Sequence, residues 1–200
     1  MSPIDLTKDP LMIDLRKSID YMDISFINLL TERMRVVGKV IYIKNRQEID
    51  LKRSEARKED MRELIEMSIN LKLESVFFQK ILDLVFQDAL AQFGDQSSDE
   101  SMDVICNGLS LDNLRLTLFN LDKSLCLVLA ERFKVVKDIG IYKHGLGIPA
   151  LDKNRWQQVL DHKVGIAKSV GVSSSLIKDI FNSIHEVALS IEEQMTDWPK

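Results

Sequence analysis

The apolar residues of this chain recur with the spacing of an α-helix over long stretches. Between Pro10 and about Asn45 they form one continuous stripe, and Asp9 and Pro10 are suited to cap and begin the helix. The residues of the stripe are Leu15, Ile19, Met22, Phe26, Leu29, Leu30, Val36, Val37, Val40 and Ile43. A helix of roughly 35 residues is about 50 Å long, and it is buried only if another element packs along its whole length.

Two shorter helices are predicted after the long one. Asp50 is expected to cap a charged helix, and an apolar helix runs from about Glu74 to Phe93. Residues 94–110 are polar and acidic and contain Gly and Ser, which is typical of a linker. The first unit is therefore expected to span residues 10–93.

The second half follows the same plan over residues 111–195. A long helix is predicted over residues 111–143, a helix opens at Asp152 and ends near Gly171, and Ser173 caps the last helix. No segment alternates between apolar and polar residues for long enough to form a sheet. The sequence therefore predicts an all-α fold.

The two halves are also related residue by residue. Residues 15–44 reappear as residues 114–143 without a gap. The residues Leu15, Arg16, Asp23, Ser25, Leu30, Glu32, Arg33, Val36, Val37 and Lys44 recur 99 positions later as Leu114, Arg115, Asp122, Ser124, Leu129, Glu131, Arg132, Val135, Val136 and Lys143. Such a repeat is too long for a solenoid unit and too short for two ordinary domains. It predicts one three-helix unit used twice and packed as a pseudo-two-fold helical bundle within one chain.

Composition narrows the class of protein. The chain has 200 residues, 45% of them hydrophobic and 29% charged, which suffices for one core or two small ones. Its net charge of −4 and the lack of a basic run with aromatic residues argue against a nucleic-acid partner, and no apolar stretch approaches the ~20 residues that span a bilayer. Cys106 and Cys126 form no CxxC pair and the N-terminus has no signal-peptide layout, so a reduced cytoplasm is expected. His144, His162 and His185 lack metal-ligand spacing, so neither a metal nor a cofactor is expected.

Basic residues interrupt the apolar stripe of the long helix. Arg33 and Lys44 are 11 positions apart, which places them within ~20° of one helix face and ~16 Å apart along its axis. Their long side chains can therefore lean together around a small anion. Arg16 precedes Arg33 by 17 positions, so it lies ~100° away around the helix and addresses a different site. A single such residue commonly extends to solvent, but all three types recur at the same spacing in the second long helix.

Antiparallel packing of the two long helices would combine these residues across the repeat. Arg16 can then reach Arg132 and Lys143, and Arg115 can reach the corresponding residues of the first helix. Buried cations without carboxylate partners in the protein imply an anionic ligand. The sequence thus predicts two cation-lined pockets, each completed by an arginine of the other half.

The order of these motifs resembles a known family. The pattern L-R-x-x-[IL]-x-x-[LM]-D, an E-R pair 17 residues after the first arginine, a lysine and a D-x-x-R resemble the all-α (AroQ-type) chorismate mutases. That family normally forms a domain-swapped dimer of three-helix chains, in which one long helix is shared by both sites. The resemblance covers nearly the whole chain, once per repeat, and so implies a fused pseudo-dimer. Whether this pseudo-dimer is monomeric or forms a further homodimer is left open.

The second unit matches the family's site without gaps. The resemblance implies that Arg132, and Arg16 from the opposite half, bind the substrate carboxylates. It also implies that Lys143 and Glu192 contact the ether oxygen. An ionised Glu192 would repel that oxygen, so it is expected to hold a proton. We therefore expect activity to fall as the pH rises, and the substitution Glu192→Gln to flatten the profile.

The remaining positions of the second unit match in part. Asp152 and Arg155 correspond to the D-x-x-R pair at the start of the second helix. Trp156 stands where the family usually has a glutamate that binds the ring hydroxyl, and Ala188 replaces a serine. The Arg155–Trp156 and Ile184–Glu186 runs resemble the mutase domains fused to DAHP synthases in some bacteria.

The first unit departs further from the family. It keeps part of the set, namely Arg33, Lys44, Asp50 and Arg53, with Arg115 from across. However, Ser54, Ala89 and Phe93 stand where the family has glutamate, serine and glutamine or glutamate, and Gln92 is expected on the wrong face. Our hypothesis is one working site on the second unit and one degenerate site retained for structure.

The resemblance implies the rearrangement of chorismate to prephenate in aromatic amino acid biosynthesis. This reaction needs no cofactor, but it needs a compact conformer of a small dianion held between fixed cations. Alternatives on the same fold are an isochorismate-pyruvate lyase and an aminodeoxychorismate mutase. A further alternative is a non-catalytic regulatory or scaffold protein that kept the fold after duplication.

Overall fold

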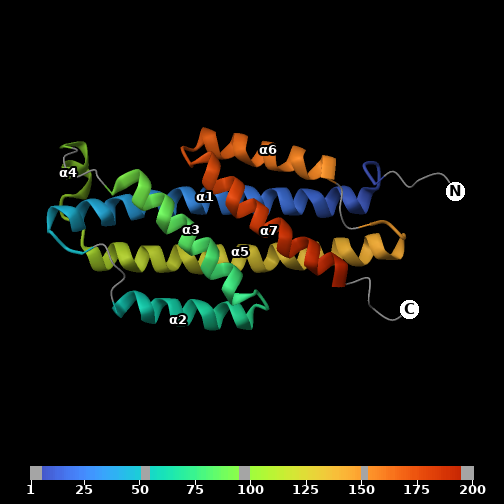
Figure 1. The fold of residues 1–200 in the computed structure, drawn as a ribbon, viewed down its shortest axis with the longest axis horizontal. Coiled ribbons are helices and arrows are strands. Elements are labelled where there is room, and N and C mark those ends of the chain that lie inside the picture. The colour runs from blue at the N-terminus through green and yellow to red at the C-terminus, as the bar shows by residue number, and fades with distance from the viewer. Residues whose placement is uncertain (1–5, 51–54, 95–99, 150–152, 195–200) are drawn as a thin grey trace.

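The computed structural model describes residues 6–50, 55–94, 100–149 and 153–194, and these form seven α-helices and no strand (Figure 1). The helices are α1 (Pro10–Arg46), α2 (Glu55–Asn70), α3 (Ser75–Phe93), α4 (Glu100–Cys106), α5 (Leu111–Gly145), α6 (Lys153–Ser169) and α7 (Ser174–Gln194). The all-α prediction is confirmed. None of the described helices is both long and apolar enough to cross a membrane.

The two long helices, α1 and α5, lie side by side and run in opposite directions (Figure 1). Helix α2 packs against α5, and α6 packs against α1, so the short second helix of each unit lies on the long helix of the other. Helices α3 and α7 cross over the long pair and contact each other. The predicted pseudo-two-fold bundle is therefore the observed arrangement.

Local signals in the sequence explain where several helices begin and end. Asp9 Oδ1 accepts a hydrogen bond of 2.8 Å from the amide of Met12, and Ser173 Oγ accepts one of 3.3 Å from Leu176. These bonds satisfy backbone donors that the first turn of a helix leaves free. Gly171 follows α6 with φ of 78°, a left-handed conformation that glycine adopts without steric cost. The proposed caps Asp50 and Asp152 are not tested, because residues 51–54 and 150–152 lie outside the described residues.

The segment predicted to be a linker contains a helix. Helix α4 packs against α1, where the hydroxyl of Tyr42 donates to Asp103 Oδ1 at 2.7 Å and Arg46 lies 3.3 Å from the same carboxylate. Met102 and Cys106 lie four residues apart, so they share one face of α4, and both pack on the core. This small apolar face explains why a polar connection docks on the C-terminal end of α1.

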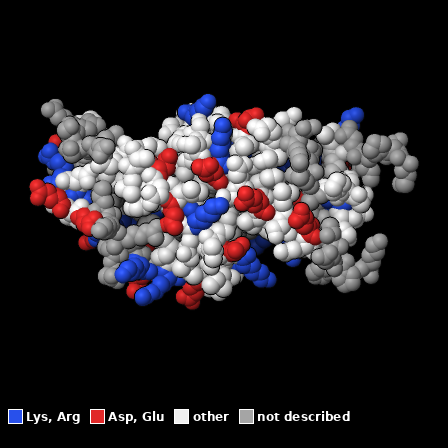
Figure 2. Space-filling view, viewed as in Figure 1, with Lys and Arg blue, Asp and Glu red and all other residues white. Residues whose placement is uncertain are grey.

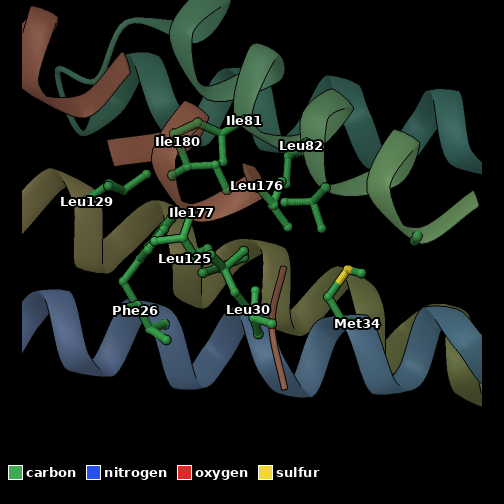
Figure 3. Packing of buried hydrophobic residues seen from close by; sticks show 14 of the residues in the cluster. Phe26, Leu30, Met34, Ile81, Leu82, Leu125, Leu129, Leu176, Ile177 and Ile180 are labelled. Carbon is green, nitrogen blue, oxygen red and sulfur yellow. The ribbon is translucent and has the colours of Figure 1, made fainter. Parts of the chain in front are cut away.

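A single hydrophobic core joins the two units (Figure 3). Phe26 of α1, Ile81 of α3, Leu125 of α5 and Ile177 of α7 are all at most 1% exposed. Phe26 also meets the ring of Phe181 edge to face, with centroids 6.2 Å apart. Because these residues come from both halves, the described residues of the two units share this core.

The surface carries mixed charges. On the face in Figure 2, acidic and basic side chains are interspersed among uncharged ones. Some pairs link successive turns of one helix, as Lys134 does with Glu131 at 2.6 Å, and such exposed pairs contribute little stability. The charges that matter for a site are therefore the buried ones.

Candidate functional site

Two reciprocal ion pairs join α1 to α5 in the interior. Arg33 Nε donates to Asp122 Oδ1 at 2.5 Å, and Arg132 Nε donates to Asp23 Oδ1 at 2.6 Å. All four residues are at most 5% exposed. Because Asp23 and Asp122 occupy equivalent positions of the repeat, as do the two arginines, the pseudo-two-fold relates one pair to the other.

The expectation that these arginines have no carboxylate partner in the protein is wrong. Each arginine follows an aspartate of its own helix by ten positions, and antiparallel packing sets it against the aspartate of the other helix. The pairs are nevertheless incomplete, since Nη1 of Arg33 and Nη1 of Arg132 are buried and lack a hydrogen-bond partner in the described part of the chain. A buried donor in that state costs about 1–3 kcal/mol. A carboxylate that reached either atom would recover this free energy.

Lys143 and Glu192 meet between α5 and α7. Lys143 Nζ donates to Glu192 Oε2 at 2.7 Å, and both side chains are largely buried, at 13% and 12% exposed. The two residues to which the resemblance assigns the ether oxygen thus lie side by side. Their separation would let both reach a single oxygen atom of a ligand.

An aromatic stack extends this cluster. The rings of Trp156 on α6 and His185 on α7 are parallel within 7°, with centroids 3.9 Å apart. His185 precedes Glu192 by seven positions, so both lie on the same face of α7. The seven-residue spacing is the signal in the sequence that could have placed His185 at this site. From the sequence, His185 was named only as part of the Ile184–Glu186 run and as a histidine without metal-ligand spacing.

The electrostatic surroundings of His185 tie it to the cations. Burial lowers the pKa of its imidazole below the usual 6.5, and the charges of Arg132 and then Lys143 lower it as well, against an opposing effect of Glu186. The imidazole is therefore neutral at pH 7, where it can both donate and accept a hydrogen bond. The second unit gathers an arginine, a lysine, a carboxyl group and a neutral imidazole beside an indole ring.

Arg16 lies at the matching level of the first long helix. Counted from the contact between Asp23 and Arg132, it is seven residues back along α1 and so comes opposite Ile139 of α5. This level lies between Arg132 and Lys143. Arg16 Nη1 donates to the carbonyl of Leu6 at 3.3 Å.

One other predicted site residue lies in the first turn of α6. Arg155 is half-buried and directly precedes Trp156. Asp152 falls outside the described residues, so its predicted role stays a prediction.

The first unit keeps its cations close together. Lys44 Nζ donates to the backbone carbonyl of Asp50 at 2.7 Å. Burial lowers the pKa of Lys44, and the positive charge of Arg115 lowers it further. Arg115, which belongs to the other half, is therefore close enough to Lys44 to act on it electrostatically. Arg115 also donates to Asp112 at 3.1 Å. Residues 51–54, which include Arg53 and Ser54, lie outside the described residues.

The polar end of the second site has an apolar counterpart in the first. Phe93 stands at the repeat position of Glu192, and its ring lies against Gly38, where a Cβ atom would be 3.4 Å away. Gln92 is exposed and donates to Asp88 on its own helix at 2.5 Å, so it faces away as expected. The first unit thus has no acid or amide at the place of Glu192.

A family model for chorismate mutase type II matches residues 15–92 and again residues 114–193. The chain belongs to the chorismate mutase type II family. The match occurs once per unit, which agrees with the internal tandem repeat. No curated protein and no solved structure matches the chain significantly. Among the described residues of this chorismate mutase family member, no cluster of three or more histidine, cysteine or acidic side chains is placed to hold a metal ion.

Proposed function

We propose that the second unit converts chorismate to prephenate. The contact between Lys143 and Glu192 carries the proposal, because it sets an ammonium donor and a carboxyl group side by side at a largely buried position. Burial and the charges of the incompletely paired Arg132 and of Lys143 all lower the pKa of His185. Membership of the chorismate mutase type II family supplies the substrate class. The proposed substrate is a small dianion, and the proposed chemistry is an isomerisation.

The proposed mechanism is conformational and electrostatic. The rearrangement breaks the C–O bond of the ether and forms a C–C bond within one molecule, so it needs no nucleophile. Arg132 and Arg16 hold the two carboxylates and favour the compact conformer in which the reacting carbons approach. Asp23 fixes Nε of Arg132 and leaves Nη1 for the ligand.

Charge develops on the ether oxygen as the C–O bond breaks. Lys143 donates one hydrogen bond to this oxygen and a protonated Glu192 donates another, both from positions fixed before the reaction. In this proposal the neutral imidazole of His185 and the indole of Trp156, which stack on each other, contact the ring of the substrate.

The first unit is proposed to be inactive in this reaction. Its long-helix cations remain, but Phe93 provides no donor at the place of Glu192. Removing one preorganised donor to a developing oxyanion typically lowers kcat by about 10²–10³. Substrate binding by the cations alone would therefore not give comparable turnover.

Product identification tests the proposal. The purified chain is incubated separately with chorismate, isochorismate and aminodeoxychorismate, and the products are identified by chromatography and mass spectrometry. Prephenate from chorismate, at a rate well above the uncatalysed one, is the expected result. Salicylate and pyruvate from isochorismate would identify a lyase instead, rearrangement of the amino substrate alone would identify the aminodeoxychorismate mutase, and no product from any of the three would indicate a non-catalytic protein.

A further inference from the structure

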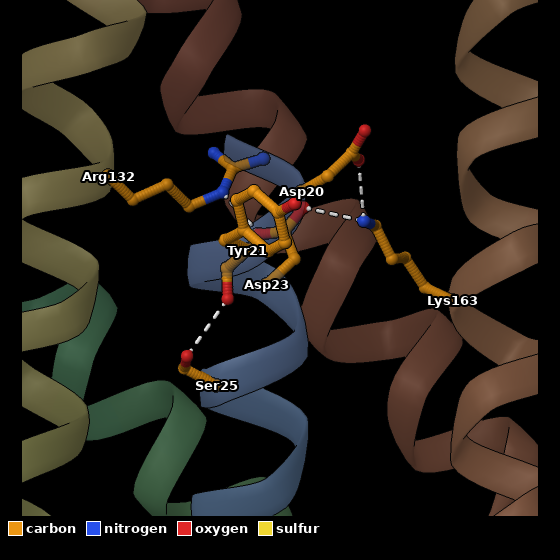
Figure 4. A network of polar contacts seen from close by, with 6 residues as sticks. All are labelled: Asp20, Tyr21, Asp23, Ser25, Arg132 and Lys163. Carbon is orange, nitrogen blue, oxygen red and sulfur yellow. Dashed lines mark hydrogen bonds and ion pairs between the residues drawn. The ribbon is translucent and has the colours of Figure 1, made fainter. Parts of the chain in front are cut away.

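A buried lysine adds a third charge to one of the two arginine pairs. Lys163 of α6 is 0% exposed, and its Nζ lies 2.8 Å from Asp20 Oδ1 and 3.3 Å from Asp23 Oδ2 (Figure 4). Asp23 is the same carboxylate that accepts from Arg132 Nε. One buried carboxylate is therefore shared by two cations.

The other half of the bundle carries different residues at the positions of Lys163 and Asp20. Helices α2 and α6 end in the same way 99 positions apart, with Lys72 and Gly171 both at positive φ. Counted back from these ends, Lys163 corresponds to Leu64, which is 2% exposed. Asp20 corresponds to Phe119 in the long-helix repeat. Two apolar side chains thus replace the lysine and its half-exposed aspartate.

The lysine adds buried positive charge around Arg132. Arg132 and Lys163 together exceed Asp23 by one positive charge, whereas the apolar Leu64 stands at the position of the lysine in the first unit. Asp20 does not cancel that excess fully, because its side chain is 50% exposed and solvent screens it. An unbalanced buried charge is costly by itself and favours an ion of opposite sign close by.

We propose that Lys163 is a positioning residue of the second site. Lys163 pairs with Asp23, the aspartate that also holds Arg132, and so neutralises part of the negative charge of that aspartate. More of the positive charge of Arg132 is then left to bind a carboxylate of the dianion. The inference rests on the proposed function and deepens it. Lys163 itself touches Asp20 and Asp23, and it acts on the ligand only through them.

The decisive variant is Lys163→Met, which keeps the length of the side chain and removes its charge. Asp23 retains Arg132 as a partner, so the ion pair becomes a neutral one. Because Arg132 binds the carboxylate in the substrate and in the transition state alike, the KM for chorismate is expected to rise about tenfold while kcat changes less than about twofold. Leu64→Met is the matched control in the other half, and it should change neither constant.

A second variant is expected to act in the opposite direction. Asp20→Asn removes the competing carboxylate, so Lys163 binds Asp23 more fully and Arg132 is released further. Affinity for the dianion should then stay the same or increase. A purely structural network predicts instead that both variants lower the melting temperature and that neither produces a selective change in KM.

Binding of prephenate, measured by titration calorimetry, provides a readout without turnover. Weaker binding by Lys163→Met than by the wild-type chain and by Leu64→Met supports the proposal. Equal prephenate binding by Lys163→Met and the wild-type chain overturns the proposal. Weaker binding by Asp20→Asn than by the wild-type chain also overturns it, and this second variant keeps the test possible if Lys163→Met fails to fold. If the wild-type chain binds prephenate but converts no chorismate, the proposed function is refuted, and the binding of prephenate by the variants still decides the role of Lys163. If the wild-type chain does not bind prephenate, both the proposed function and the role of Lys163 are refuted.

Discussion

At the scale of the residue, the position of Arg132 on its helix could be predicted from the sequence, but the residue that it binds could not. Its place on the long helix, 11 positions before Lys143, follows from helical spacing alone. Its hydrogen bond to Asp23 joins residues 109 positions apart. Asp23 was recognised in the sequence as one of the repeated residues. Only the packing of α1 on α5 shows that it binds Arg132.

The two repeat-related lysines provide the most direct test of one working site. Lys143→Met is expected to lower kcat for chorismate by about 10²–10³, because it removes a donor to the developing charge on the ether oxygen. The matched variant Lys44→Met should leave kcat within about threefold. Steady-state kinetics on both variants checks this, and a loss of turnover in Lys44→Met alone would show that the two sites have been assigned in reverse.

His185 predicts how stability depends on pH. Burial and the nearby charges of Arg132 and Lys143 lower its pKa in the folded chain below 6.5, whereas in the unfolded chain it titrates near 6.5. Between these two values the unfolded chain binds more protons, so the free energy of unfolding falls as the pH falls below about 6.5.

The variant His185→Phe keeps a ring against Trp156 and removes the titration. Its melting temperature should therefore fall less than that of the wild-type chain between pH 7.5 and pH 5.5. Thermal unfolding followed by circular dichroism at several pH values measures the difference. An equal fall in both proteins would assign the acid sensitivity to other groups.

At the scale of the helix, the paired arginines and aspartates set how α1 lies against α5. Most of the contact between these helices is apolar, and apolar side chains tolerate small shifts along the axis. A hydrogen-bonded pair in the interior does not, because a shift would leave a buried charge unpaired. The two pairs therefore favour one register of the antiparallel helices.

A double-mutant cycle on the pair of the first unit tests this structural role. Asp122→Leu leaves the buried Arg33 without the carboxylate of its ion pair and is expected to lower the free energy of unfolding by about 3–5 kcal/mol. Adding Arg33→Met removes the unpaired charge and should recover a large part of that loss. Urea unfolding of the single and double variants gives the coupling, and purely additive effects would show that the pair does not act as a unit.

Helix α4 illustrates the limit of composition at this scale. Residues 94–110 have the acidic, polar composition of a linker, but Glu100–Cys106 within this segment form a helix. The composition did not reveal that Met102 and Cys106 form one short apolar face that docks on α1. Such a face is too short to stand out as a periodic pattern.

At the scale of the whole molecule, the shared core makes the fused pair one cooperative unit. We expect a single unfolding transition in urea, because Phe26, Ile81, Leu125 and Ile177 join helices of both halves in one cluster. Tryptophan fluorescence reports mainly on the second half, where Trp156 and Trp198 lie, and circular dichroism reports on all helices. The two curves should coincide, and separate midpoints would mean that the halves fold independently.

The sequence by itself determined the lengths of the two long helices, the internal repeat, the positions of the cations and the family, since each depends on spacing along one chain or on local order. The tertiary structure alone decided that Asp23 and Asp122 bind the arginines, that Lys163 shares Asp23, that Trp156 stacks on His185 and that Phe93 covers Gly38. These contacts depend on how helices distant in sequence are set against one another. That register results from packing of the whole core, and the periodicity of any one helix does not encode it.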